Sequence, residues 1–367
     1  MSGRVSTSPV AVRGPDRNPR AGVVVGPIGL AWRPRLIAVT VVALAAALVL
    51  LVVSIGVGSV ALTPVDVVRA LTGGGTDLQR LIVLQLRLPR ALTGALVGLV
   101  LGIAGALTQT FTRNPLATPD VIGVTSGASA GAVAAIVLGG GTYSVSTLLL
   151  GGGIPVAATL GALIAAALVY GLGWRGGVES YRLILVGIGV GSVLTAITSY
   201  LLVRAQISEA QQATVWLVGS LSGASWPSLW PLLAVASVAV PLSIATSTAL
   251  GLSQLGDETA VGVGLSIQRH RLTVIALAVV LTAAAVAAAG PVGFVAFVVP
   301  QVALRVAATS RPPIVLSGLV GTALVLAADL AGRTVFPGEV PVGLVTTVVG
   351  APYLIWLLVR HRKELVS

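Results

Sequence analysis

The stretch Ala91–Phe111, ALTGALVGLVLGIAGALTQTF, contains no charged residue and is long enough to cross a bilayer as a helix. Gly94, Gly98 and Gly102 recur within it at every fourth position, which places them on one helical face. In lipid, small residues on one face let two helix backbones approach closely. The stretch therefore predicts a membrane-spanning helix that packs tightly against a neighbour.

Apolar stretches of similar character flank this one on both sides, which makes ten in total. We expect an all-α, polytopic membrane protein with about ten transmembrane helices and, because ten is even, both termini on one side. Pro300 predicts a short or broken helix in the eighth span, since proline removes a backbone donor. The remaining predicted spans are Leu36–Val53, Val121–Leu138, Ile154–Leu172, Leu183–Val203, Leu229–Leu250, Leu272–Ala289, Phe294–Ala308, Ile314–Leu330 and Val342–Val359.

The composition of the 367 residues supports this class. Hydrophobic residues make up 56% and charged residues 9%, whereas soluble domains have about 25% charged residues. The chain therefore cannot cover a water-facing surface, which argues against a cytosolic enzyme, a nucleic-acid-binding domain and a secreted protein. A cleaved signal peptide is the alternative for the first apolar run, but that run and the polar region before it are too long.

Charge and residue counts define the orientation and exclude two kinds of chemistry. Sixteen of the 22 arginines and lysines fall in the termini and the loops on their side, so the positive-inside rule places both termini in the cytoplasm. The net charge of +11 is thus assigned to cytoplasmic loops rather than to nucleic-acid binding. The absence of cysteine excludes disulfides and thiolate metal sites. The only lysine, Lys363, cannot form a nucleotide-binding P-loop, so any ATP is hydrolysed by another chain.

The distribution of polar and apolar residues divides the chain into three segments. Residues 1–35 are rich in arginine, proline and glycine, which predicts a disordered cytoplasmic tail. Residues 36–360 form the transmembrane domain, with a long cytoplasmic segment at about 250–271, and residues 361–367 form a cytoplasmic C-terminal tail.

Four stretches do not fit simple spans. They are Ile82–Arg90 (IVLQLRLPR), Arg113–Gly123 (RNPLATPDVIG), Leu250–Arg271 (LGLSQLGDETAVGVGLSIQRHR), and Gly290–Arg305 (GPVGFVAFVVPQVALR) with its continuation through ADLAGR, EVPVG and GAPYLIW. Taken in order, they resemble the motifs of the FecCD/BtuC-type permease family of ABC importers, which take up ferric siderophores, haem or vitamin B12. The resemblance runs from about Leu36 to Arg360 and implies a BtuC-like type II importer fold.

The resemblance implies a role for the long cytoplasmic segment. In the family this loop sits in a groove of the ATPase subunit and transmits nucleotide-driven closure to the membrane helices. Gly256–Leu265 predicts two short helices broken by Gly262 and Gly264, with acidic residues at a helix start, where they complement the dipole. A solvated connecting loop is the alternative. The predicted coupling residues are Leu255, Gly256, Asp257, Glu258, Ala260, Gly262 and Gly264.

On the outer face, the family uses arginines to meet acidic residues of a substrate-binding protein. The matching positions are Arg87 in RLPR and Arg333 in ADLAGR. The alternative for each is a snorkelling arginine that anchors a helix end. Asp329, inside a predicted span, is either a proton-coupling group or the structural partner of Arg333 one helical turn away.

The resemblance also places cytoplasmic gates of the pathway at Asn114 and Leu116, and around Ser180 and Tyr181. Asn114 before a proline is equally a turn former. Glu179 and Tyr181 stand where small polar residues are frequent in the family, so the second gate departs from the family pattern.

The sequence therefore predicts a permease subunit in the bacterial plasma membrane, with no catalysis and no cofactor of its own. The implied partners are ABC ATPase subunits, a second permease chain in a homo- or heterodimer, an extracytoplasmic siderophore-binding protein and the lipid bilayer. An ion-coupled secondary transporter and an integral membrane enzyme are the alternatives from other classes. Pro300-Gln301, where many members have Pro-His, favours a ferric siderophore over vitamin B12 as cargo, with haem as a further possibility.

Overall fold

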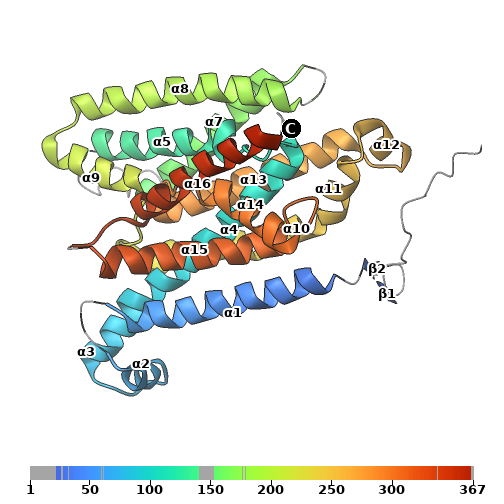
Figure 1. Cartoon of the computed structure of the whole chain (residues 1–367). Helices are drawn as coiled ribbons and strands as arrows, with labels where there is room; N and C mark the ends of the chain where they lie inside the picture. The colour runs from blue at the N-terminus through green and yellow to red at the C-terminus, as the bar shows by residue number, and fades with distance from the viewer. Residues whose placement is uncertain are drawn as a thin grey trace, which may run out of the picture.

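The computed structural model describes residues 22–25, 28–31, 33–58, 60, 62–139, 153–175, 177, 179–336 and 338–364. Figure 1 shows a bundle of long helices that run roughly parallel or antiparallel to one another. Among the described residues, seven helices are long and apolar enough to cross a membrane, and three shorter apolar helices accompany them. The ten predicted spans are confirmed as α1 (Pro34–Gly56), α4 (Leu88–Thr112), α5 (Val124–Leu138), α7 (Gly153–Gly173), α8 (Ser180–Arg204), α10 (Trp226–Ala245), α13 (Ile267–Ala289), α14 (Val295–Ala307), α15 (Ile314–Thr334) and α16 (Val342–Glu364).

Short elements cap the two ends of this bundle. The helices α11 (Ser247–Ser253) and α12 (Asp257–Gly262) lie at the same end as the last described residues of α16, and we call this the α12 end. The opposite end, which we call the α2 end, carries α2 (Pro64–Leu71), α3 (Asp77–Arg80) and α9 (Ile207–Val218). A π-helix, η1 (Leu81–Arg87), leads into α4, and a 3₁₀ helix, η2 (Pro119–Ile122), precedes α5.

Most of the tail predicted to be disordered, residues 1–35, lies outside the described residues. Of its described part, β1 (Gly22–Val25) and β2 (Ile28–Ala31) pair as an antiparallel hairpin, and α1 begins at Pro34. The C-terminal tail is described only as far as the end of α16.

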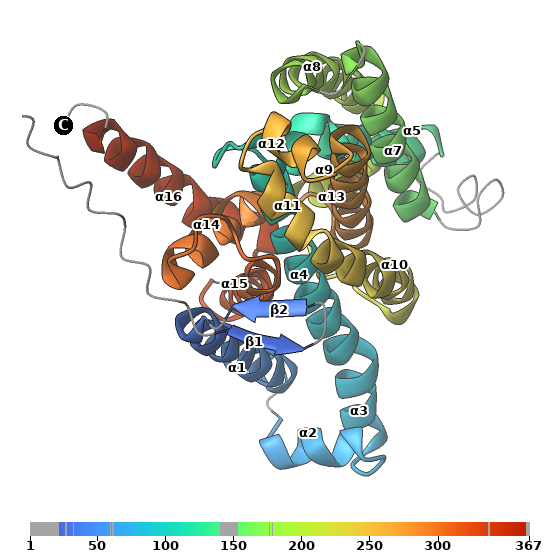
Figure 2. The ribbon, with the colours of Figure 1, turned by 90° about the vertical axis from the view of Figure 1, so that its right-hand side faces the viewer.

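Helix α4 forms the centre of the bundle and packs against α10, α13, α14 and α15 (Figure 2). Its glycines have the predicted effect. A Cβ added to Gly98 or to Gly102 would lie 2.3 Å from a carbonyl oxygen of α15, and one added to Gly105 would lie 1.9 Å from the Ala296 oxygen of α14. At these positions there is room for a glycine hydrogen but not for a methyl group, so the backbone of α4 is in direct contact with the backbones of α14 and α15.

The sixth predicted span, Leu229–Leu250, ends earlier than the sequence predicts. The apolar run to Leu250 is not one helix, because α10 ends at Ala245 and α11 starts at Ser247. Thr246, between them, donates its hydroxyl to the Ser243 oxygen at 2.7 Å and so takes up one of the last carbonyl groups of α10. Pro300 leaves α14 unbroken, and that helix is short as expected, at 13 residues.

The motif RLPR explains the π-helix before α4. Pro89 has no N–H, and its ring crowds the carbonyl group four residues earlier in a regular helix. The backbone widens in response, and the amide of Leu88 bonds the Val83 oxygen five residues back. This wider turn determines where Arg87 and Arg90 point at the α2 end.

Candidate functional site

A cluster of four charged side chains lies at the α2 end, between α4, α15 and the α15–α16 loop. Asp329 is 2% exposed and receives the Arg90 guanidinium, with Nη2 2.7 Å and Nε 3.1 Å from Oδ1. Arg333 Nη2 lies 3.0 Å from the other oxygen, Oδ2. Arg90 Nη2 also pairs with Glu339 Oε1 at 2.6 Å, and the Glu339 side chain is 47% exposed. The cluster is therefore electrically balanced, with one exposed carboxylate at its rim.

The partnership of Asp329 with Arg333 is one that the sequence had offered, but Arg90 was missed. Arg90 and Asp329 are 239 residues apart, so no local spacing signals the pair. The only available hint was that RLPR and ADLAGR both fall at the same end of the predicted spans.

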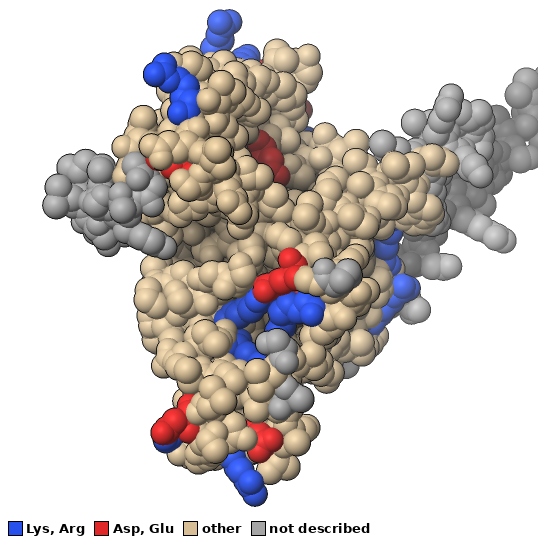
Figure 3. All heavy atoms as spheres, turned by 90° about the vertical axis from the view of Figure 1, so that its left-hand side faces the viewer, with Lys and Arg blue, Asp and Glu red and all other residues tan. Residues whose placement is uncertain are grey.

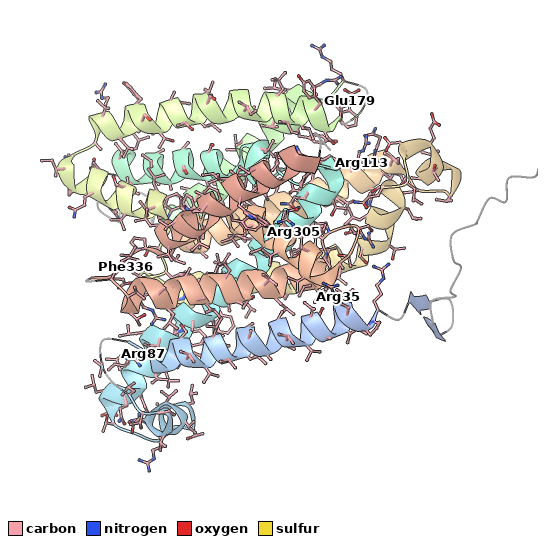
Figure 4. All side chains as sticks on the ribbon, viewed as in Figure 1. Arg35, Arg87, Arg113, Glu179, Arg305 and Phe336 are labelled. Atoms are coloured by element: carbon pink, nitrogen blue, oxygen red, sulfur yellow. The ribbon has the colours of Figure 1, made fainter. Side chains whose placement is uncertain are left out.

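The two arginines predicted to dock a partner turn their guanidinium groups into the protein. Arg87 is buried and donates to the Ile55 and Gly56 oxygens at 3.2 and 2.7 Å, and also to the Val60 oxygen. These bonds satisfy carbonyls at the C-terminal end of α1, where a cation is favoured. Figure 4 labels Arg87 at this junction. A side chain at position 58 would displace this guanidinium, since a Cβ on Gly58 would lie 2.7 Å from Arg87 Nη2.

Arg333 is held in the same way. Besides Asp329, it bonds the Val57 oxygen at 3.1 Å and the Ser54 hydroxyl at 2.8 Å, and only 10% of its side chain is exposed. Figure 3 shows basic and acidic atoms gathered at the centre of the α2 end, with a second charged group below on α2 and α3. Docking by Arg87 and Arg333 stays a prediction. The structure adds that both side chains tie α1 to the bundle.

At the α12 end, Asp257 connects the cytoplasmic segment to two spans. Its Oδ1 lies 2.8 Å from Arg113 Nη2, and its Oδ2 lies 2.6 Å from Arg271 Nη2. Arg113 ends α4 in the left-handed conformation, with φ 51°, and also donates to the Ser253 oxygen of α11. Arg271 belongs to the start of α13. One carboxylate thus fastens α12 to α4 and α13 together.

The other predicted coupling residues are arranged around this anchor. Asp257 and Glu258 lie in the first turn of α12, as predicted, while Leu255 is 66% exposed and Ala260 is fully buried. Gly256 and Gly264 have positive φ values of 107° and 88°, which favour glycine. The prediction of two helices within Gly256–Leu265 was wrong. This range contains one helix, α12, which ends at Gly262. The other short helix of the segment, α11, ends at Ser253, before the range begins.

The predicted gate residues lie in the loop that follows α4 and at the start of α8, and their role as gates stays a prediction. Asn114 Oδ1 accepts a 2.9 Å bond from the Leu116 amide, so the turn chemistry offered as an alternative for Asn114 is present. Leu116 is 41% exposed. Ser180 is the first residue of α8, and Tyr181 is 78% exposed. Figure 4 labels their neighbours Arg113 and Glu179, which lie at the same end of the bundle.

A groove of about 530 Å³ runs between α8 and the η2–α5 segment. Gly187 brings α8 against η2, since a Cβ there would lie 1.7 Å from the Val121 oxygen. Small and polar residues make up most of the lining, with Ser192, Thr195 and Ser199 exposed on α8, and Val121 and Ile188 complete it. A span that faced only lipid would present apolar side chains there. This face of α8 therefore suits water or a partner helix.

Gln301, which favoured a siderophore as cargo, is placed away from this groove. It is buried between α14 and α4 and donates to Gln109 Oε1 at 2.6 Å, while Gln109 Nε2 donates to the Phe297 oxygen at 2.9 Å. Its contacts are thus between helices. Among the described residues, no group of three or more His, Cys, Asp or Glu side chains could hold a metal ion.

The fold and its two charged ends define a multi-pass helical membrane protein whose short α12 helix is fastened to the transmembrane core. The chain belongs to the FecCD transport family, whose model matches residues 46–360. It is 38% identical over 308 residues to the ferric enterobactin transport system permease protein FepG of Escherichia coli, a match that covers 84% of this chain and 91% of the relative. It is 39% identical over 322 residues to the achromobactin transport system permease protein CbrC of Dickeya dadantii, with 87% and 90% covered.

A solved structure has the same fold. It is described as a metal-chelate type ABC transporter in an inward-facing conformation. The two structures match with a TM-score of 0.77 and 26% sequence identity, over 90% of this chain and 100% of the other. The family resemblance inferred from the ordered motifs is therefore confirmed.

Proposed function

We propose that this chain is the membrane-spanning permease subunit of an ATP-binding-cassette importer and carries ferric-siderophore complexes into the cytoplasm. The observation that carries the proposal is the attachment of α12 to α4 and α13 through Asp257. A passive loop needs no such anchor. A helix that receives force from a separate ATPase needs contacts with the spans that move, and the two Asp257 ion pairs supply such contacts.

The surface of the α12 segment supports an ATPase as the partner. Leu255, Val261 and Val263 are each more than 60% exposed at this end of the molecule. Apolar side chains exposed on a segment outside the spans favour contact with another protein. The positive-inside pattern supports a cytoplasmic location for this end and both termini, on the side where an ATPase subunit has its nucleotide. The chain itself hydrolyses nothing.

The α8 groove supports a second permease chain. Its hydroxyl-bearing face would form one wall of a pathway, with the matching face of a homologous or identical chain as the other wall. Asn114, Leu116, Ser180 and Tyr181 would close that pathway at the cytoplasmic end. At the opposite end, the region around Arg87 and Arg333 would receive an extracytoplasmic siderophore-binding protein.

The test is uptake by proteoliposomes that contain this chain with its ATPase, any second permease chain, and the siderophore-binding protein outside. We expect ATP-dependent accumulation of a ⁵⁵Fe-labelled siderophore and none with an ATPase variant unable to hydrolyse ATP. Ferric catecholate, hydroxamate and citrate-type chelates, haem and vitamin B12 are compared as cargo. Accumulation driven by a proton gradient without ATP would refute the proposal in favour of a secondary transporter. Uptake of vitamin B12 or haem alone would leave the importer in place and replace its cargo.

A further inference from the structure

A cavity at the α12 end contains two arginines and has no assigned role. Its volume is about 230 Å³, and it lies between the start of α1, the α10–α11 junction and the α14–α15 loop. Arg33 and Arg311 line it together with the apolar side chains of Leu36, Ile244 and Leu316. It is separate from the α8 groove and from the Asp257 anchor, since it shares no lining residue with the one and does not include the other.

Among the described residues, no carboxylate balances the positive charge of this cavity. Within the described part of the chain, no carboxylate forms an ion pair with Arg33, Arg35 or Arg311. Burial, and after it the nearby charge of Arg33, lower the pKa of Arg311. An anion between the two guanidinium groups would relieve both effects, because it supplies the missing charge and hydrogen-bond acceptors.

Backbone geometry adds to the preference for an anion. The first residues of α1 and α15 line the cavity, and neither helix has a side-chain cap at its N-terminus. The first amides of a helix have no acceptor inside the helix, and the helix dipole is positive there. Ile314, Val315 and Leu316, at the start of α15, therefore offer unoccupied N–H groups beside Arg311.

We propose that this cavity binds the phosphate headgroup of an anionic phospholipid from the adjacent membrane leaflet. A lipid fits better than a soluble phosphate because the polar end of the cavity is joined to apolar surface. Ile244 and Val315 line the cavity and are themselves 41% and 43% exposed. Acyl chains can lie against these two side chains while arginines hold the headgroup, as in basic pockets between transmembrane helices.

The position of the cavity ties its occupancy to α11. Arg311 Nη1 donates to the Ser247 oxygen, at the first residue of α11. A Cβ on Gly251 would lie 2.9 Å from the same nitrogen, so the guanidinium lies flat against that helix. A headgroup on Arg311 therefore fixes the helix that leads to α12.

The test measures phosphatidylglycerol and phosphatidylcholine binding to the purified full-length chain by native mass spectrometry in mild detergent. We expect one tightly held phosphatidylglycerol per chain and weaker phosphatidylcholine binding. The double variant R33Q/R311Q should bind phosphatidylglycerol about thirtyfold more weakly, since one arginine beside an anionic headgroup contributes roughly fivefold. The matched control is R269Q, which removes one exposed positive charge at the same end and should leave affinity within about twofold.

A second variant keeps the charge and fills the space. V315W places a large side chain at a position that is 43% exposed and lines the cavity, so the fold should tolerate it, and we expect the bound phospholipid to be lost. Unchanged phosphatidylglycerol affinity in V315W and in R33Q/R311Q, or equal affinity for the two lipids, would overturn the proposal. Displacement of phosphatidylglycerol by inorganic phosphate at the same concentration would show a soluble-anion site and refute the lipid assignment.

Discussion

Replacing Asp329 by asparagine tests the charged cluster at the α2 end. Asp329 accepts contacts from two arginines whose side chains are 14% and 10% exposed, and it is itself 2% exposed. Loss of one partner from such a buried pair costs about 3–5 kcal/mol, because the remaining charge is left uncompensated. Arg90 retains Glu339 at 2.6 Å, so we expect the lower end of that range, about 3 kcal/mol.

The measurement is the free energy of unfolding in mixed micelles as the fraction of denaturing detergent rises, followed by the fluorescence of the six tryptophans. The matched control is D77N. Asp77 pairs with Arg80 at the same end, but its side chain is 95% exposed. Such a surface pair contributes about 0–1 kcal/mol, so D77N should unfold almost like the wild type.

A double-mutant cycle with R90Q and D329N separates the pair from its surroundings. We expect a coupling energy of at least about 1 kcal/mol, since the two side chains are in direct contact. If D329N lies within 1 kcal/mol of the wild type, or if the coupling energy is near zero, the cluster does not stabilise the fold as argued.

Three further changes probe other contacts. D257N should change the free energy of unfolding by no more than about 1 kcal/mol, because the Asp257 side chain is about half exposed. It should nevertheless lower the amount of cargo transported per ATP hydrolysed. E258Q is the control, and an equal amount of cargo per ATP in the two variants would contradict the role of Asp257 as an anchor. Gly98→Ala should destabilise by about 1–3 kcal/mol or more, because its Cβ would lie 2.3 Å from a backbone oxygen, whereas Gly189→Ala, with no atom within 4 Å of its Cβ, should be neutral in the same unfolding assay. Arg87→Ala should cost about 2 kcal/mol through the lost bonds to α1 carbonyls, and a variant that loses binding-protein affinity with unchanged stability would show that Arg87 acts mainly as a docking residue.

The spans could be predicted from the sequence because lipid imposes a simple condition on it. Each backbone polar group must be satisfied within its own helix, so every crossing reads as a long apolar run. The close approach of α4 to α15 was also visible, since Gly98 and Gly102 are four residues apart. What the pattern left open was the partner helix, because many spans carry small residues.

The ionic contacts could not be predicted, for a geometric reason. Asp329 and Arg90 come from spans far apart in the chain, and which spans become neighbours depends on packing rather than on local pattern. The same holds for Asp257 with Arg113, which are 144 residues apart. Within the charged cluster, the pair of Asp329 with Arg333 could be read from spacing, because the two residues lie one helical turn apart.

Both ends of the molecule use one arrangement, and α4 is the part that they share. Each end holds a carboxylate between two arginines, of which one belongs to α4: Arg90 for Asp329 and Arg113 for Asp257. Twenty-three residues separate these arginines in the sequence, which is about 35 Å along a helix. The hydrocarbon core is about 30 Å thick, so both clusters fall near its boundaries, where charge costs far less than at the centre.

That spacing has a mechanical consequence. Between its two arginines, α4 is in backbone contact with α14 and α15, and such contacts leave no room for sliding. If α12 is displaced as the proposed function requires, we expect α4 to carry the displacement as a rigid body rather than to absorb it along its length. Because Asp329 and Arg333 join α4 to α15 and α1 at the far end, we predict that a movement transmitted through Asp257 shifts these three helices together, unless the weaker Asp257 ion pairs break first.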